Sequence, residues 1–184
     1  FHMEYPGIRL KIYNHSSPEA IEAVKSGKVD FAVISTPTEV EMPLKKVILQ
    51  PFREILVGGQ TFTALSSQTL SLAELKNYPL ICLGEETMTY RFYKGLFLFH
   101  GLELKPDTEA ATTDQILPLV KCDLGLGFLP EEMAKDALQK GEIVQICLRD
   151  AIPERNICLV YDVQHPLNEA ARQFRKTIME EKKA

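Results

Sequence analysis

Hydroxyl side chains gather at three bends of this sequence, each where an apolar run gives way to a helical pattern. The residues at the three bends are His15, Ser16 and Ser17, then Thr87, Met88 and Thr89, then Thr112 and Thr113. Unpaired N–H groups and the positive end of the helix dipole favour an anion at a helix start. Serine and threonine also cap helices where nothing binds. The chemistry that these bends predict is hydrogen bonding to a small anion, with plain capping as the alternative.

Patterns for catalysis or metal binding are missing from the sequence. No nucleophile with an adjacent base and no phosphate loop is present. An acid/base pair of Glu85 and Glu86 acting with His15 is the enzymatic alternative, but adjacent glutamates point in different directions on most backbones. We therefore expect no enzyme activity, no metal and no cofactor.

The cysteines follow neither a zinc nor a disulfide pattern. Four are present without C-x-x-C spacing: Cys82, Cys122, Cys147 and Cys158. No histidine motif lies near them that would activate a nucleophilic thiol. The sequence therefore favours free thiols in a cytosolic protein, and leaves a redox pair between two of them open.

Composition indicates a globular chain with a core. The 184 residues are 45% apolar, which suits one domain or two small ones. The sequence contains no secretion signal and no apolar run near the roughly 20 residues that span a bilayer. Because it begins at Phe1 rather than methionine, we expect a fragment of a longer protein.

The charge argues against direct binding of nucleic acid by this part of the protein. The formal charge is −4 and the pI is about 5.6, without a basic stripe. Basic residues cluster only near the end of the chain, at Arg172, Arg175, Lys176, Lys182 and Lys183. Because Glu169, Glu180 and Glu181 are interleaved with them, the pattern predicts a solvated helix face.

The stretch 8–35 predicts a strand, a helix and a strand that position the first bend. Alternation over 8–13 predicts a half-buried strand, and helical spacing follows until Gly27. Ser17 is the expected N-cap because Pro18 favours the first helical position, although Ser16 with Glu19 also fits a capping box. The apolar run 31–34 predicts a strand covered on both faces. The whole stretch is typical of a βαβ crossover.

Strands and helices alternate through the rest of the chain. The expected strands are 47–49, 54–58, 79–83, 108–111, 124–129, 143–146 and 157–161, and the expected helices begin near residues 72, 91, 113, 131 and 167. This order predicts an α/β protein with mainly parallel sheets, with a domain crossing near Gly58. Ligands of such folds bind beyond the carboxyl ends of the strands, where the three bends lie.

Three segments carry a family resemblance. They are 5–8 (Tyr-Pro-Gly-Ile), the run from Leu10 through His15 to Val33 with its Gly-Lys-Val-Asp-Phe-Ala-Val ending, and 124–130 (Leu-Gly-Leu-Gly-Phe-Leu-Pro). In this order and spacing the chain resembles, over nearly its whole length, the effector-binding domain of LysR-type transcriptional regulators.

The resemblance implies two Rossmann-like subdomains joined by two crossing strands, as in type II periplasmic binding proteins, with the effector between them. Subdomain I would comprise 1–57 and 162–184, without its first strand and most of its first helix, and subdomain II 58–161. A DNA-binding winged helix-turn-helix domain is expected before residue 1. Asp123 stands where the family usually has glycine, and aspartate tolerates the left-handed backbone.

The resemblance also implies which residues contact the effector. By position in the family pattern they are His15, Ser16, Ser17, Ser35, Thr36, Thr87, Met88, Thr89, Thr112 and Thr113. Phe128 fits the core and the pocket wall equally well, and Gly125 and Gly127 are expected to be structural.

The implied function is ligand sensing by a cytoplasmic regulator. A small, anionic effector would shift the arrangement of the subdomains and so re-aim attached DNA-binding domains, in a homodimer or homotetramer. No membrane partner is expected. A free-standing solute-binding protein of a transporter has the same fold and remains the alternative.

Overall fold

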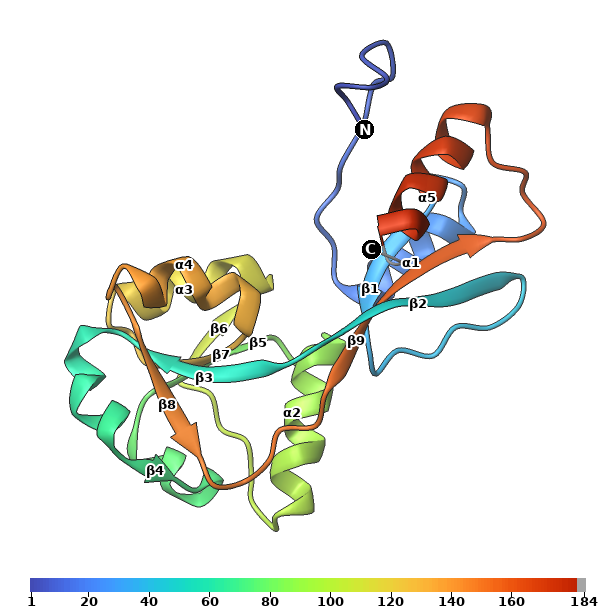
Figure 1. The fold of residues 1–184 in the computed structure, drawn as a ribbon. Helices are drawn as coiled ribbons and strands as arrows, with labels where there is room; N and C mark the ends of the chain where they lie inside the picture. The colour runs from blue at the N-terminus through green and yellow to red at the C-terminus, as the bar shows by residue number, and fades with distance from the viewer. Residues whose placement is uncertain (182–184) are drawn as a thin grey trace. The chain divides into compact units, whose positions relative to one another are not determined.

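The computed structural model describes residues 1–181 and shows two units. Unit 1 comprises Phe1–Pro51 and Asn156–Ala184, and unit 2 comprises Phe52–Arg155. The chain passes between them twice, inside strand β2 (Leu44–Phe52) and at the start of strand β9 (Arg155–Asp162) (Figure 1). The α/β fold with two subdomains and two crossing strands is confirmed. The division lies at 51/52 and 155/156, whereas the sequence placed it at 57/58 and 161/162.

Unit 1 is a small sheet with helices against it. Its strands lie in the order β1 (Ala32–Ser35), β9, β2, and β1 runs antiparallel to β9. Helix α1 (Ser17–Lys25) packs Ile21 and Val24 against Ile34 and Val160 in one buried cluster. Helix α5 (Glu169–Glu181) stacks Phe174 on Phe31, with ring centroids 5.5 Å apart.

The basic cluster near the end of the chain is partly described. Arg172 pairs with Glu169 at 2.7 Å, and the Arg175 guanidinium lies 4.7 Å from the Tyr161 ring centroid. These contacts fit the solvated helix face that the sequence predicts. Lys182 and Lys183 lie outside the described residues.

The predicted βαβ crossover in unit 1 is wrong. Residues 8–13 form no strand, and the side chains of Ile12 and Leu10 are 90% and 45% exposed. A segment of alternating apolar and polar residues forms a strand only where a neighbouring strand completes its backbone hydrogen bonds. In the described structure no strand pairs with residues 8–13. Strand β1 is also not covered on both faces, because Val33 is 54% exposed.

Unit 2 is built on a six-stranded sheet in the order β4-β8-β3-β7-β5-β6. The strands are β3 (Glu54–Gly58), β4 (Thr69–Leu70), β5 (Leu80–Leu83), β6 (Thr108–Ala110), β7 (Leu126–Pro130) and β8 (Val144–Leu148). The helices are η1 (Gln60–Ser67), η2 (Leu72–Asn77), α2 (Met88–Phe99), α3 (Thr113–Lys121) and α4 (Glu131–Gln139), of which η1 and η2 are 3-10 helices.

The sheet of unit 2 is mixed rather than mainly parallel, and in unit 1 strand β1 pairs with β9 in the antiparallel direction. In unit 2, β5 runs parallel to β6 and β7, and β4 parallel to β8. Strand β3 runs antiparallel to both of its neighbours, β7 and β8. The prediction failed at β3 because this strand enters the middle of the sheet directly from the crossing, without a helix to reverse its direction.

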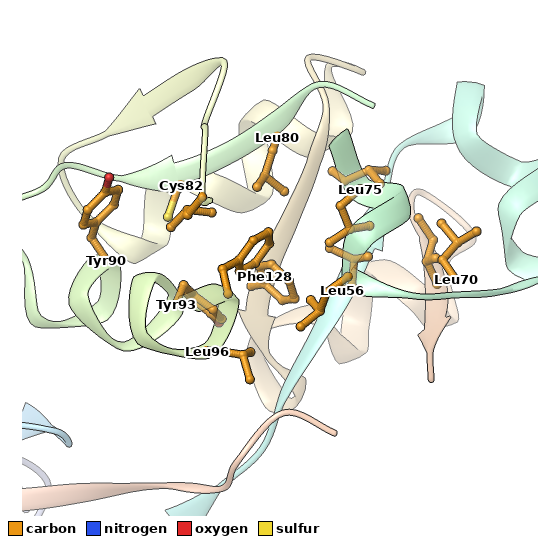
Figure 2. Close-up of a cluster of buried hydrophobic side chains, with 14 of the residues drawn as sticks. Leu56, Leu70, Leu75, Leu80, Cys82, Tyr90, Tyr93, Leu96 and Phe128 are labelled. Carbon is orange, nitrogen blue, oxygen red and sulfur yellow. The ribbon is translucent and has the colours of Figure 1, made fainter. Parts of the chain in front are cut away.

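Both faces of the unit 2 sheet are buried. Leu56, Cys82 and Phe128 contribute to a cluster that α2 covers, while their sequence neighbours Val57, Ile81 and Leu129 contribute to one that α3 and α4 cover. Successive side chains of a strand point to opposite faces. The continuous apolar runs of these strands follow from burial on both sides. Figure 2 shows Phe128 in the middle of the first cluster.

Local signals placed most helix ends correctly. Gly27, Gly101 and Gly141 follow α1, α2 and α4 with φ of 68°, 70° and 67°. Asp123 takes the expected left-handed backbone with φ of 58°. Of the two short strands expected around Pro51, 54–58 is confirmed as β3, whereas 47–49 is part of the longer β2, which continues through Pro51. Strand β2 lies at the edge of its sheet, where a missing N–H is tolerated.

Candidate functional site

Two of the predicted effector segments meet at one end of unit 1. A short turn, residues 26–31, joins α1 to β1, and the two elements pack against each other in one cluster. They therefore run in opposite directions, so the start of α1 lies at the same end of the unit as the end of β1. Ser16 and Ser17 therefore lie at the same end of unit 1 as Ser35 and Thr36.

The start of α1 already holds a carboxylate. The backbone N–H and the hydroxyl of Ser16 both donate to Glu19 Oε2, at 2.9 and 2.8 Å, so the N-cap is Ser16 rather than Ser17. These hydrogen bonds from Ser16, assisted by nearby His15, lower the pKa of the Glu19 carboxyl. Ser16 therefore acts as a cap in this structure, and Ser17 remains the hydroxyl available to a ligand.

His15 and Thr36 differ in their hydrogen bonds. The Nε2 atom of His15 is buried and has no hydrogen-bond partner within residues 1–181, although its ring stacks on Tyr13 with centroids 5.9 Å apart. Thr36 is tied to β9, because its Oγ1 accepts from the Asn156 N–H at 2.9 Å and its N–H donates to the Asn156 carbonyl at 3.0 Å. A buried ring nitrogen of this kind needs a polar partner, which a ligand can supply.

The other predicted segments meet at one edge of unit 2. Strands β5 and β6 pair in parallel with Leu83 opposite Ala110, so their carboxyl ends lie side by side. The Gly84 N–H donates to the Ala110 carbonyl at 3.3 Å just beyond these ends. Helices α2 and α3 start here, which brings the two threonine bends together at the carboxyl edge of the sheet, where ligands bind in such folds.

The threonines at this edge have different roles. Thr87 is buried and fully used, since its hydroxyl donates to the Gly84 carbonyl at 2.8 Å and accepts from the Tyr90 N–H at 3.1 Å. Thr112 is the N-cap of α3 in a capping box with Gln115. Thr89 is half-buried and accepts from Arg155 Nη2 at 3.0 Å. Thr89 is thus the hydroxyl at α2 that is not used for capping.

Sequence reasoning missed the charged pair behind Thr89. Arg155 Nη1 lies 2.8 Å from Glu54 Oε1, and both side chains are 3% exposed. The hydroxyl of Tyr93 donates to the other Glu54 oxygen. Burial raises the pKa of the Glu54 carboxyl and lowers the pKa of Arg155, and the attraction between the two opposes both changes. No local pattern marks this pair, because 101 residues separate its members.

Phe128 is not brought to the edge with the threonines. Its side chain is 3% exposed in the core, and its ring stacks on Tyr93 with centroids 4.5 Å apart. Of its two expected roles, these surroundings support the core. Met88 lies half-buried at the start of α2, with its sulfur 3.8 Å from Arg91 Nη1.

The glycines of the family pattern have structural surroundings. A Cβ at Gly125 would lie 2.6 Å from the Pro79 carbonyl oxygen, and a Cβ at Gly127 would lie 2.7 Å from Ile116. Such contacts leave no room for a side chain at either position. The structural role expected for both residues follows from these close approaches.

Other reactive groups form no second centre in the described structure. Cys82 and Cys158 are buried and Cys122 and Cys147 exposed, all as free thiols, and burial raises the pKa of Cys82 to about 11. Within residues 1–181, no group of three or more His, Cys, Asp or Glu residues is placed to hold a metal. None of the helices described there is long and apolar enough to cross a membrane.

Comparison with known families matches residues 1–183 to the LysR substrate binding domain. A curated relative, "Uncharacterized HTH-type transcriptional regulator YwbI" of Bacillus subtilis, is 23% identical over 95% of this chain and 57% of its own length. The "Hydrogen peroxide-inducible genes activator" of Haemophilus influenzae is 20% identical over 98% of the chain and 60% of its own. The chain therefore spans less than two thirds of the length of these relatives, and both are named as regulators of genes rather than as parts of transporters.

Solved structures share the fold. The "Effector binding domain of QuiR in complex with shikimate" has a TM-score of 0.79 and 17% identity, covering 94% of this chain and 81% of its own. The regulatory domain of Synechocystis CcmR in complex with 2-PG has a TM-score of 0.81 and 16% identity, covering 99% of this chain and 87% of its own. At these identities the comparison establishes the architecture.

Proposed function

The chain belongs to the LysR substrate binding domain family, and we propose that it senses a small ligand for a LysR-type transcriptional regulator. The observation that carries this proposal is the family match across residues 1–183. The geometry supports it, because each unit presents hydroxyl groups and a helix start where segments of the family pattern meet. Free-standing delivery of solute to a transporter, the alternative from sequence, is not favoured by relatives that are named as regulators.

The ligand in this proposal is a small anion. Helices α2 and α3 both start just beyond the carboxyl ends of the paired strands β5 and β6, so the positive ends of two helix dipoles lie at this edge of unit 2. In unit 1, the buried Nε2 of His15 has no hydrogen-bond partner within the described residues, and Ser17 follows two residues later in the chain. The hydroxyl and amide groups at the edge of unit 2, and the hydroxyl and imidazole groups in unit 1, are each of the kind that binds a carboxylate or a phosphate.

Sensing requires the ligand to bind one arrangement of the regulator more tightly than another. In the proposed protein, DNA contacts come from a separate helix-turn-helix part, consistent with the net charge of −4 in this chain. The regulator would act in the cytoplasm, where its DNA lies, as a homodimer or homotetramer. No catalytic step is involved.

A thermal-shift screen of this domain tests the proposal. The panel holds shikimate and other small carboxylates, phosphates, inorganic anions, and neutral sugars for comparison. A ligand at 100 times its Kd stabilises the folded state by about 2.7 kcal/mol, which is easily measured. Stabilisation by one anion supports sensing, stabilisation by neutral compounds alone refutes the anion assignment, and a flat response to the whole panel removes the support for ligand sensing.

Substitutions then test the site. With the anion found in the screen, Ser17→Ala and Thr89→Ala should each weaken binding by roughly 1–3 kcal/mol and leave the fold intact. Ser16→Ala should mainly lower the free energy of unfolding, by about 1 kcal/mol, because it removes the α1 cap. Ser66→Ala, an exposed hydroxyl in η1, is the matched control. Unchanged affinity in both Ser17→Ala and Thr89→Ala would rule out these two hydroxyls as ligand contacts.

A further inference from the structure

Glu54 and Arg155 form a buried charged pair in the largely apolar interior of unit 2. Both side chains are 3% exposed, and their closest atoms lie 2.8 Å apart. Burying two charges carries a desolvation cost that their attraction does little more than offset, so such a pair is weak evidence for stability. A buried ion pair is better explained by a role in fixing one specific geometry of the chain.

The position of the pair shows which geometry it fixes. Glu54 opens β3 two residues after unit 2 begins at Phe52, and Arg155 is the residue at which unit 2 ends. The guanidinium also lies over the rings of Phe52 and Phe92, 5.3 and 4.8 Å from their centroids. The pair therefore joins the two places at which the chain crosses between the units.

A third contact links this pair to the proposed site. Arg155 Nη2 donates to Thr89 Oγ1 at 3.0 Å. Arginine has only donors, so the threonine hydroxyl must accept this bond and keeps its own proton for another acceptor. The contacts found within residues 1–181 give that proton no acceptor. The hydroxyl proton of Thr89 is therefore available to a ligand oxygen.

We infer that Arg155 is a positioning residue that orients the Thr89 hydroxyl toward the ligand and connects it, through Glu54, to both crossings of the chain. The part of this inference that concerns ligand binding by Thr89 rests on the proposed function. The connection from Thr89 to the crossings is a property of the protein alone, and it is testable without any ligand.

Two backbone amides report on the crossings. The Asn156 N–H, next to Arg155, donates to Thr36 Oγ1 at 2.9 Å, and the Glu131 N–H donates to the Arg53 carbonyl at 3.0 Å. Hydrogen exchange at these amides measures how often each crossing opens. The measurement is made by NMR on the ligand-free domain, so a negative ligand screen does not affect its outcome.

Thr89→Val should accelerate exchange at both amides by about tenfold, since valine keeps the shape of threonine and removes the acceptor for a charged donor. Thr89→Ser keeps the hydroxyl acceptor, so exchange at both amides should be as slow as in the wild type. The matched control is Thr63→Val, which removes a hydroxyl bond of the same unit, 2.7 Å long to the Gln60 carbonyl, away from Arg155.

A second substitution tests whether the effect passes through Arg155. In the Arg155→Lys variant, a single ammonium group that pairs with Glu54 cannot also donate to Thr89. The double variant Arg155→Lys/Thr89→Val should therefore show the same amide exchange rates as Arg155→Lys alone. Wild-type exchange at both amides in Thr89→Val would overturn the inference. So would an equal acceleration in Thr63→Val, or a drop in the urea midpoint large enough to explain the faster exchange by global unfolding.

Discussion

Replacement of Phe128 by alanine separates the two roles that the sequence left open for this residue. The ring is 3% exposed and stacks on Tyr93 at 4.5 Å within the cluster that includes Leu56. Burial of a phenylalanine side chain stabilises by about 1.5–3 kcal/mol, and the cavity left by its loss brings the cost of Phe→Ala in a core to about 3–5 kcal/mol. We expect Phe128→Ala to lower the free energy of unfolding by about 4 kcal/mol.

The assay is urea unfolding followed by far-UV circular dichroism. With a slope of about 2 kcal/mol per molar urea, the expected loss lowers the midpoint by about 2 M. Phe99→Ala is the matched control, because the Phe99 side chain is 85% exposed and its loss should cost less than about 0.5 kcal/mol. A loss below about 1 kcal/mol in Phe128→Ala, together with weakened ligand binding, would refute the core assignment and make Phe128 a pocket wall.

Two further predictions concern backbone fit and acid stability. Gly125→Ala should destabilise by more than 1 kcal/mol, because its Cβ would lie 2.6 Å from the Pro79 carbonyl oxygen. Gly95→Ala, at an exposed position of α2 where a Cβ meets nothing within 4 Å, should instead stabilise by about 0.5–1 kcal/mol, and urea midpoints test both. The hydrogen bond with His165, together with one from the Gln164 N–H, lowers the pKa of the Asp162 carboxyl from its ordinary value of 3.8. The ionised carboxylate therefore stabilises the folded state at pH values above 3.8. This stabilisation is lost as the pH falls through the lowered pKa of the folded state. Asp162→Asn should therefore be less stable than the wild type near neutral pH and approach it in acid, and a constant difference down to about pH 2 would contradict this linkage.

The features that the sequence predicted are local ones. The capping box of Ser71 with Glu74, the glycine that ends α2 and the left-handed backbone of Asp123 each depend on a few neighbouring residues. Even at Asp123 the prediction covered only the backbone. Its carboxylate also accepts from the N–H and hydroxyl of Thr61, 62 residues away in the chain, and no local pattern indicates this.

The features that the sequence did not predict depend on distant partners. The alternation of Ile8, Leu10 and Ile12 suits a strand, but a strand needs a neighbour, and the alternation carries no information about one. The Glu54–Arg155 pair joins residues far apart in sequence and is visible only when β3 and β9 are in place. The fold places the hydroxyl-bearing segments of the predicted effector site at one edge of each unit and leaves Phe128 in the core, while ligand contact stays a prediction.

The distribution of the thiols gives each unit an internal reporter of its own opening. Cys82 lies in the core of unit 2 and Cys158 in the core of unit 1, whereas Cys122 and Cys147 are exposed. After serine replaces the two exposed cysteines, alkylation of each remaining thiol requires its own unit to open. The rates of modification, read by mass spectrometry on peptides containing Cys82 or Cys158, then give the opening equilibrium of each unit separately, without an attached fluorophore.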